Sequence, residues 1–275
     1  MSASRASKRF GQHFLTSSPT ITRIIELIAP HPDQTIIEIG PGRGALTVPL
    51  AQSGADLLAI EFDRDLIEPL QKKLSDYANI RVVQSDILEY TPPESVETIT
   101  LVGNLPYNIT SPVIEWVVAH RDRIHRAVFM VQQEMAQRLA SEPNSKDWAP
   151  IALFTQLHFQ IHNRFAVKPE AFTPPPKVTS SVIELTRHAN PVKVAHPRAF
   201  ECVVRAAFAH RRKQLINNLV PEIVELPEAL RSLLREIGLD ETVRAEQMST
   251  EHFLDLTEHL VARTMLKDIQ GQQEM

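Results

Sequence analysis

The sequence has almost no cysteine and no long apolar run. Cys202 is the only cysteine among 275 residues, which excludes an internal disulfide and with it a secreted, disulfide-stapled scaffold. Its apolar runs are far shorter than the roughly 18–20 residues that a membrane-spanning helix needs. We therefore expect a cytoplasmic protein without a membrane partner.

An excess of positive charge is also missing. Lysine and arginine number 29 against 33 acidic residues, so the formal net charge is −4 and the chain as a whole has no general affinity for nucleic acid. Local clusters of basic residues are present nevertheless: Arg5, Lys8 and Arg9, and then Arg205, His210, Arg211, Arg212 and Lys213. Such clusters are either solvated faces or a surface that meets RNA on one side of the protein.

Motifs for binding a metal are absent from the sequence. The 11 histidines include no H-E-x-x-H pattern and no cluster with cysteine. We therefore expect no metal site.

Short apolar strands alternate with amphipathic helices through the first two-thirds of the chain. Strands are predicted at Thr35–Ile39, Leu57–Glu61, Ile80–Val83, Ile99–Val102 and Ala127–Val131, and helices at Pro19–Ile28, Asp65–Leu74 and Pro112–His120. Two consecutive β-like stretches follow, Leu153–Phe165 and Val178–Leu185. The pattern predicts an α/β fold: a mostly parallel sheet covered by helices and closed by an antiparallel hairpin.

The character of the sequence changes after Arg187. Asn190-Pro191 and His196-Pro197 mark a linker. Helices are predicted beyond it, at Arg198–Leu219, Pro227–Ile237 and Thr250–Met265. We expect two domains, residues 1–190 and a small all-α domain of residues 191–275.

The first predicted strand runs into a glycine-rich turn, Gly40-Pro41-Gly42-Arg43-Gly44-Ala45. Such a turn lets a ligand approach the backbone closely, although it also fits the dinucleotide pattern G-x-G-x-x-G/A and an ordinary tight turn. Glu61 ends the second strand, where an acid about 20 residues after the glycines holds ribose hydroxyls. Asp86 follows the third strand and is either an acceptor for a cofactor adenine or a helix cap.

The segment Asn104-Leu105-Pro106-Tyr107 ends the fourth predicted strand. The exocyclic nitrogen of adenine is a poor nucleophile, because its lone pair is delocalised into the ring. The Asn104 side-chain oxygen and the carbonyl of Leu105 or Pro106 can accept its two hydrogens, and Tyr107 can stack on the base. Positioning for in-line attack on a sulfonium methyl is worth roughly 7–11 kcal/mol, so no strong general base is required.

Four segments together resemble the rRNA adenine dimethyltransferases. Asn104–Tyr107 is similar to the N-x-P-[FY] signature of amino-group methyltransferases of nucleic acids, and Lys8–Leu15 to the family's K-x-F-G-Q-[NH]-F-L opening. Phe172–Ser180 resembles its F-x-P-x-P-K-V-x-S loop. Arg211–Leu219 resembles the R-R-K-x-L-x-N-N-L motif of the bacterial branch that modifies small-subunit (16S) rRNA and whose loss gives kasugamycin resistance.

This resemblance implies a Rossmann-like fold that uses S-adenosylmethionine. It also implies the product: two adjacent adenosines, each N6,N6-dimethylated, in the 3′-terminal hairpin of 16S rRNA, made during ribosome biogenesis. The partner is then the small ribosomal subunit, and we expect the protein to act as a monomer.

The resemblance also implies roles for single residues. The expected cofactor contacts are His13, Leu15, Gly40, Glu61, Asp86 and Asn104. The expected catalytic residues are Asn104, Leu105, Pro106, Tyr107 and Phe172, with the two aromatic rings sandwiching the target base. Arg211, Arg212 and Lys213 are expected to contact rRNA. On the predicted helix, His210, Lys213 and Asn217 share a face, while Leu215 and Leu219 pack inward.

Three features depart from the family pattern. His13 stands where many members have asparagine, Gln133 where lysine is frequent, and Trp148-Ala149-Pro150-Ile151 in place of Y-G-x-L. These departures bear on local packing and RNA contact rather than on the chemistry.

Other functions fit parts of the sequence. A sister enzyme that methylates large-subunit rRNA shares the first motifs, but Pro41 and the Arg211–Leu219 motif favour the small-subunit enzyme. The intact set Glu61, Asp86, Asn104 and Tyr107 speaks against a non-catalytic ribosome-binding assembly or transcription factor, although a checkpoint role could coexist with catalysis. An NAD-dependent dehydrogenase leaves Asn104–Tyr107 unexplained.

Overall fold

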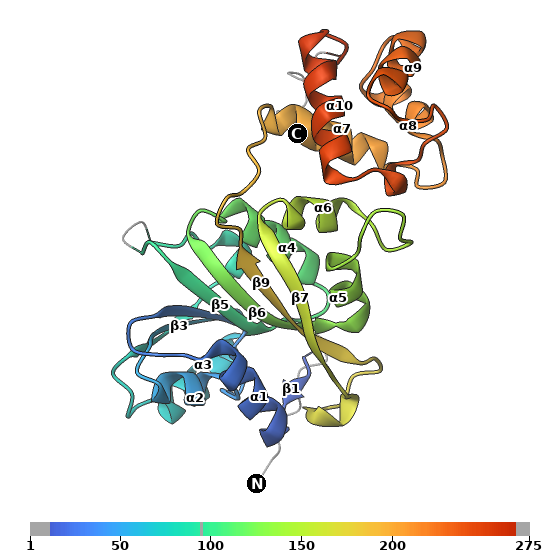
Figure 1. Ribbon diagram of the computed structural model, residues 1–275. Helices are drawn as coiled ribbons and strands as arrows, with labels where there is room; N and C mark the ends of the chain where they lie inside the picture. Colours follow the sequence, from blue (N-terminus) through green and yellow to red (C-terminus); the bar gives the residue numbers. More distant parts are fainter. Residues whose placement is uncertain (1–11, 94–95, 268–275) are drawn as a thin grey trace. The chain divides into compact units, whose positions relative to one another are not determined.

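The computed structural model describes residues 12–93 and 96–267, and divides into two compact units (Figure 1). One unit contains residues up to Ala140 together with His158–Ala189, and the other contains Ser141–Leu157 together with the chain from Asn190 onward. The division after residue 189 lies close to the expected one at 190. The segment 141–157, in contrast, groups with the C-terminal helices and not with the sheet.

The larger unit is built on a seven-stranded sheet with the order β4-β3-β2-β5-β6-β9-β7. Its strands are β2 (Thr35–Ile39), β3 (Asp56–Glu61), β4 (Ile80–Gln84), β5 (Ile99–Asn104), β6 (Ile124–Gln132), β7 (Phe159–Val167) and β9 (Ser180–Arg187). The first five are parallel to one another, and β9 runs antiparallel to both β6 and β7. The predicted parallel sheet with its antiparallel hairpin is therefore confirmed.

A separate two-stranded sheet joins the start of the described chain to residues far along it. β1 (Phe14–Leu15) pairs antiparallel with β8 (Phe172–Thr173), with Leu15 opposite Phe172. The 3₁₀ helix η2 (Pro169–Ala171) precedes β8. This pairing fixes the segment around His13 next to the Pro-rich loop after β8.

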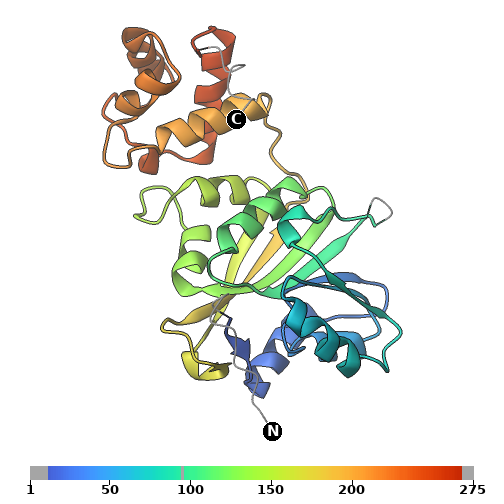
Figure 2. The same cartoon turned by 180° about the vertical axis from the view of Figure 1, so that it is seen from behind.

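Helices cover both faces of the seven-stranded sheet (Figures 1 and 2). Buried residues of α1 (Ser18–Ile28), α2 (Thr47–Gln52) and α3 (Arg64–Lys73) share one core cluster with alternate strand residues such as Ile36 and Leu57. Figure 2 shows α4 (Thr110–Ala119) and α5 (Gln133–Leu139) in front of the other face. The 3₁₀ helix η1 (Ile87–Glu89) follows β4. Because both faces are covered, the inner parallel strands β2, β3 and β5 are mostly buried and apolar, whereas the edge strand β4 is not.

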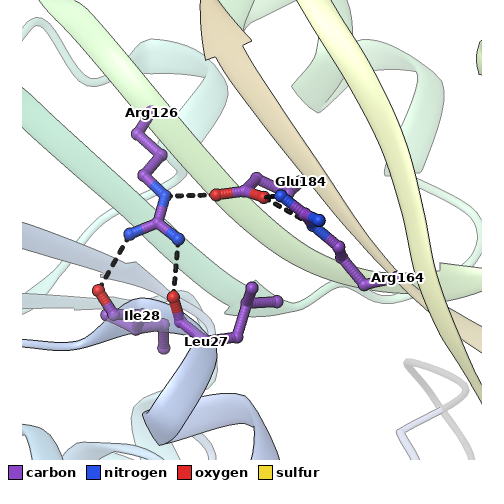
Figure 3. A network of polar contacts seen from close by, with 5 residues as sticks. All are labelled: Leu27, Ile28, Arg126, Arg164 and Glu184. Atoms are coloured by element: carbon purple, nitrogen blue, oxygen red, sulfur yellow. Dashed lines mark hydrogen bonds and ion pairs between the residues drawn. The ribbon is translucent and has the colours of Figure 1, made fainter.

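A partly buried ion network around the buried Glu184 ties α1 to the sheet (Figure 3). Arg126 donates from Nε to Glu184 Oε1 at 2.5 Å and from its two other nitrogens to the carbonyls of Leu27 and Ile28. Arg164 binds the second oxygen of Glu184. Burial would raise the pKa of Glu184, but the hydrogen bonds from Arg164 and Arg126 outweigh it and hold that pKa below its ordinary value. The network satisfies the last carbonyls of α1, which would otherwise lack partners.

The smaller unit is helical. It contains α6 (Pro150–Gln156), α7 (Pro197–Ala207), α8 (Leu215–Glu222), α9 (Pro227–Glu236), the 3₁₀ helix η3 (Ala245–Gln247) and α10 (Thr250–Ala262). Its own core includes Trp148, Leu153, Phe200 and Phe253. The strand predicted from Leu153 is wrong at its start, because residues 150–156 form α6 and β7 begins only at Phe159. Pro150 stands in the first turn of α6, where its missing N–H costs nothing.

The single helix predicted over Arg198–Leu219 is also wrong. α7 ends at Ala207, and residues 208–214 form a connecting loop before α8. The buried side chain of Asn218, in α8, donates to the carbonyls of Ala207 and His210. These bonds attach the loop to α8. The prediction that His210, Lys213 and Asn217 share a helical face therefore fails, whereas Leu215 and Leu219 are fully buried as predicted.

Over the described residues, every helix is too short or too polar to cross a membrane.

Candidate active site

The glycine-rich turn follows the carboxyl end of β2. Gly40 and Gly42 both have a left-handed backbone, with φ of +66° and +57°. A Cβ built on Gly40 would point into open space, whereas one on Gly42 would approach the Phe14 ring at 3.2 Å. The backbone at Gly40 is therefore accessible to a ligand, and the backbone at Gly42 packs against the segment that carries β1.

Glu61, at the end of β3, binds this turn directly. Its two carboxylate oxygens accept hydrogen bonds from the backbone N–H groups of Gly42 at 3.0 Å and Asp63 at 2.8 Å. Burial raises the pKa of Glu61, and these backbone hydrogen bonds partly offset that effect. Glu61 thus shapes the glycine-rich turn, and it also lines a pocket next to that turn.

Glu38 is a second buried acid, which the sequence analysis missed. It is only 2% exposed, and its Oε2 atom has no hydrogen-bond partner among the described residues. Burial raises the pKa of Glu38 to about 8; the nearby Thr47 hydroxyl lowers it and the charge of Glu61 raises it further. A carboxyl within the otherwise apolar strand Thr35–Ile39 was the sequence signal that could have revealed it.

Residues 13–15, which precede α1, lie next to the glycine-rich turn and line the same pocket. The His13 ring donates from Nδ1 to the carbonyl of Pro174 at 2.7 Å, and the Arg43 guanidinium lies 4.2 Å from the centre of the Phe14 ring. Leu15 is buried in the core beside α1. Three different parts of the chain thus hold His13 and Leu15 at the pocket.

Asn104 is oriented by the same segment. Its Nδ2 donates to the backbone carbonyl of His13 at 2.9 Å. Because that bond uses the donor end of the amide, Oδ1 stays available as an acceptor. The Pro106 carbonyl already accepts from Ile109 N and Thr110 Oγ1, whereas no described residue donates to the Leu105 carbonyl. Of the two carbonyls left open by the sequence, Leu105 is the better acceptor for a ligand.

Tyr107 follows Asn104 in a half-buried position. Its hydroxyl is hydrogen-bonded to Ser180 Oγ at 2.8 Å, and its ring stacks on that of His13 with centroids 5.8 Å apart. Burial raises the pKa of Tyr107, while the bond to Ser180 lowers it. The ring is therefore held in one orientation by an anchored hydroxyl.

One pocket collects most of the predicted residues. Its lining includes His13, Leu15, Gly40, Glu61, Asn104, Leu105, Pro106 and Tyr107, together with Glu38, which was not predicted. Its enclosed volume is about 80 Å³. Ligand pockets usually measure about 300–1,000 Å³, so this enclosed part suits one end of a larger ligand.

Asp86 lies outside that lining, at the carboxyl end of the neighbouring strand β4. Its side chain accepts from Leu88 N at 2.9 Å and caps η1, as one of the two interpretations predicted. Phe62 is 57% exposed directly after Glu61, and Leu88 is also exposed. Phe62 after Glu61 and Leu88 after Asp86 thus offer an exposed apolar surface on which a flat ring of a ligand can lie. The sequence analysis did not predict this feature.

Phe172 is placed differently from the expectation of an open stacking ring. It is 3% exposed and belongs to the core cluster beneath α1, and it is absent from the pocket lining. Stacking on a base requires this ring to be uncovered, so its catalytic role stays a prediction.

The basic residues expected to contact RNA lie in the loop between α7 and α8. Arg211, Arg212 and Lys213 are all exposed. Arg211 forms an ion pair with Glu246 at 2.9 Å. The other basic cluster, Arg5, Lys8 and Arg9, lies outside the described residues, as does the beginning of the Lys8–Leu15 motif.

Two of the departures from the family pattern lie at defined places in the structure. Gln133 is the first residue of α5, and its N–H donates to the Thr179 carbonyl. Trp148 is buried in the helical unit, where its Nε1 donates to the Met248 carbonyl at 3.1 Å.

No group of three or more histidine, cysteine, aspartate or glutamate side chains in the described ranges is arranged to hold a metal ion.

Comparison with known proteins explains this arrangement. A model of the family described as ribosomal RNA adenine dimethylase matches residues 3–261. The chain belongs to this family. The enzyme class predicted from the motifs, an rRNA adenine dimethyltransferase, and its cofactor S-adenosylmethionine are thereby confirmed.

Relatives within the family cover nearly the whole chain. The chain is 41% identical over 261 residues to the ribosomal RNA small subunit methyltransferase A of Pseudomonas aeruginosa, covering 93% of this chain and 95% of that protein. It is 39% identical over 269 residues to the protein of the same name from Chromohalobacter salexigens, covering 94% of this chain and 92% of the relative.

Solved structures share the fold. A dimethyladenosine transferase from Plasmodium falciparum superposes with a TM-score of 0.80 at 22% identity, covering 92% of this chain and 99% of the other. The 23S rRNA methyltransferase ErmE superposes with a TM-score of 0.69 at 29% identity, covering 90% and 99%. The predicted Rossmann-like methyltransferase fold is confirmed.

Proposed function

We propose that this protein transfers methyl groups from S-adenosylmethionine to the N6 atoms of two adjacent adenosines in the 3′-terminal hairpin of 16S rRNA, making each N6,N6-dimethyladenosine during ribosome biogenesis. The names of its curated relatives, which are small-subunit rRNA methyltransferases, support this target. The observation that carries the chemistry is the orientation of Asn104 by the His13 carbonyl. A cytoplasmic location, action as a monomer, and the small subunit as partner belong to the same proposal.

The residues of the pocket fit the cofactor. The open space at Gly40 accommodates a group close to the backbone, and the unpartnered Oε2 of Glu38 suits an ammonium group. Glu61 and Asp86 lie at the ends of adjacent strands, in the order expected for ribose and adenine. His13 and Leu15 would close over the cofactor. When bound, S-adenosylmethionine supplies an electrophilic methyl group.

The chain's own residues then prepare the adenosine. Asn104 Oδ1 and the Leu105 carbonyl accept the two hydrogens of the exocyclic amine, which directs the nitrogen lone pair away from the ring. Pro106 stiffens the turn between them. Tyr107, anchored through Ser180, supplies a flat face for the base. Positioning carries the reaction, so the pocket needs no strong base: the sulfur–methyl bond would break as the nitrogen–methyl bond forms, leaving S-adenosylhomocysteine, and the methylated amine would give its extra proton to water.

The structure of ErmE makes a large-subunit rRNA target the second candidate, because this chain is 29% identical to it. The higher identity to small-subunit methyltransferases favours the first candidate. A checkpoint role in subunit assembly is compatible with catalysis and would persist in an inactive variant.

The test compares Asn104→Ala with Asn108→Ala, an exposed asparagine in the same loop. The substrates are under-methylated small subunits and, in a separate assay, unmodified large-subunit rRNA, each with radiolabelled cofactor. Loss of one preorganised polar contact to the reacting group costs about 10²–10³-fold in rate. We expect such a loss for Asn104→Ala and parent activity for Asn108→Ala, with circular dichroism showing both folded. Near-parent turnover by Asn104→Ala would contradict the mechanism, and parent activity confined to large-subunit rRNA would contradict the target.

A further inference from the structure

The helical unit contains a second pocket, which the proposed chemistry does not use. We call it the Arg205 pocket; it measures about 310 Å³ and is lined by Trp148, Ala149, Pro150, Arg205, Phe208 and Arg211. This volume reaches the lower end of the range of about 300–1,000 Å³ that small-molecule sites occupy. The lining has two guanidinium groups and no carboxylate. Such a lining suits an anion with a flat apolar part.

Another pocket of the same unit provides a contrast. It is lined by Arg235, Gly238, Leu239, Asp240 and Glu241 and measures about 560 Å³. Arg235 there lies 3.4 Å from a carboxylate oxygen of Glu241 that belongs to the same lining. The positive charge is balanced within the pocket, so its size alone gives no preference for an anion.

Arg205 is held in place but remains able to bind. Its Nε donates to Glu201 Oε1 at 2.8 Å, one turn earlier on α7, and its guanidinium lies 5.7 Å from the centre of the Phe154 ring. The side chain is 55% exposed. An exposed pair of this kind is worth roughly 0–1 kcal/mol, and a guanidinium has five N–H donors. A phosphate can therefore share or displace the Glu201 contact at little cost.

Arg211 approaches the same pocket from the loop after α7. Its Nε donates to Glu246 Oε2 at 2.9 Å and its Nη2 contacts the Ser145 carbonyl at 3.4 Å. The loop itself is fixed by Asn218, which donates to the Ala207 and His210 carbonyls. Two arginines from separate elements thus face one cavity in defined positions.

The apolar part of the lining is rigid. Phe208 is half-buried and stacks on Phe253, with ring centroids 5.8 Å apart and planes 28° apart. Trp148 is buried and anchored through the Met248 carbonyl. The Trp148-Ala149-Pro150 departure from the family pattern therefore forms one wall of a cavity whose lining also contains the Arg205 and Arg211 side chains.

We propose that the Arg205 pocket binds an unpaired nucleotide of the rRNA, with its base against Phe208 and the Ala149-Pro150 wall and its phosphate at Arg205 and Arg211. This inference rests on the proposed function, because the rRNA substrate brings the nucleotide to the protein. The bound nucleotide is not the one that is methylated. It is a contact that adds affinity for the small subunit through stacking and phosphate binding.

The test measures binding of the full-length protein to small subunits that lack the modification, at several salt concentrations. Arg205→Ala should weaken binding about tenfold and reduce the salt slope by about one. Arg205→Lys should restore the slope but only part of the affinity, because lysine keeps the charge without the planar fork. Arg263→Ala is the matched control: it removes an arginine of the same unit that is likewise paired with a carboxylate, Glu236. It should bind like the parent.

Ultraviolet crosslinking identifies the occupant. Mass spectrometry should find a nucleotide attached to the peptides that contain Ala149-Pro150 or Phe208, and Arg205→Ala should lose this crosslink. A ribosomal protein crosslinked there instead would overturn the proposal, as would unchanged binding by Arg205→Ala. Methyl transfer by the parent is measured on the same particles. If the parent methylates these particles and Arg205→Ala binds them normally, only the proposal for the Arg205 pocket is refuted. If the parent transfers no methyl group to them, the proposed function is refuted.

Discussion

Glu38 is a carboxyl whose surroundings strongly change its acidity. Its pKa is raised from the ordinary value of 4.5 to about 8, because burial disfavours the charged form. In the unfolded chain this carboxyl loses its proton near pH 4.5, whereas the folded protein keeps it. The free energy of unfolding should therefore fall as the pH rises from about 5 to 8.

Glu38→Gln should remove much of this dependence in the cofactor-free protein. One pKa unit corresponds to about 1.4 kcal/mol, so the change is on the order of a few kcal/mol. Urea denaturation at pH 5.5, 7 and 8.5 measures it. Glu68→Gln, on the exposed side of α3, serves as the control and should keep the parent profile. Parallel profiles for the parent and Glu38→Gln would show that Glu38 is not held protonated.

The two residues predicted to stack on the base, Tyr107 and Phe172, are placed differently in the structure. The sequence predicts two equivalent stacking rings, whereas Tyr107 lines the pocket and Phe172 is buried in the core.

Stacking is worth roughly 1–3 kcal/mol per base, and extruding a base costs a few kcal/mol. Tyr107→Leu should therefore slow methyl transfer about tenfold, and Phe172→Leu should slow it too if the ring is uncovered by the RNA. Cofactor binding should stay nearly intact in both variants. If both turn over at the parent rate in the radiolabel assay, the sandwich is wrong.

Other site residues were predictable because their type and position are local properties. A glycine turn after an apolar strand, acids at the ends of the next two strands, and Asn104–Tyr107 after the fourth all appear in the sequence. The contacts that orient them were not predictable. The hydrogen bond from Asn104 to His13 joins residues 91 positions apart, and no local pattern encodes it.

Among the elements, the strands were predicted well because buried parallel strands read as short apolar runs. The break between α7 and α8 was missed, since residues 208–214 contain neither glycine nor proline. Asn218 explains the break: its side chain competes for the carbonyls of Ala207 and His210 from the following helix. A tertiary contact thus overrides a helical pattern.

The loop between these helices has a measurable consequence. Replacing Arg211, Arg212 and Lys213 together with alanine should weaken binding to the small subunit and lower the salt slope by about two to three, because phosphate contacts release counterions. Affinity for S-adenosylmethionine should barely change, since the pocket that we propose for it lies in the other unit. Alanine at Arg231, Arg235 and Arg263 removes equal charge from the same unit as a control. An unchanged salt slope in the loop variant would assign these residues a structural role only.

For the whole molecule, motifs spread over the chain predicted the family, while composition predicted little. The net charge of −4 gives no hint of an RNA partner. Residues 141–157 were expected with the sheet, yet Trp148 and Leu153 pack in the core of the helical unit. A division made from the sequence assigns residues 141–157 to the same unit as the strands on either side of them. Only the packing of their side chains shows that they belong to the helical unit. That the larger unit binds the cofactor and the helical unit binds RNA remains our proposal.

The most direct test of the central claim maps dimethylated adenosines in the rRNA of a strain that lacks this protein. We predict that two adjacent adenosines in the 3′-terminal hairpin of 16S rRNA are unmodified in that strain. The parent protein should restore both, and Asn104→Ala should restore neither. Dimethylation that persists at these positions without the protein, or a loss confined to large-subunit rRNA, would contradict the account.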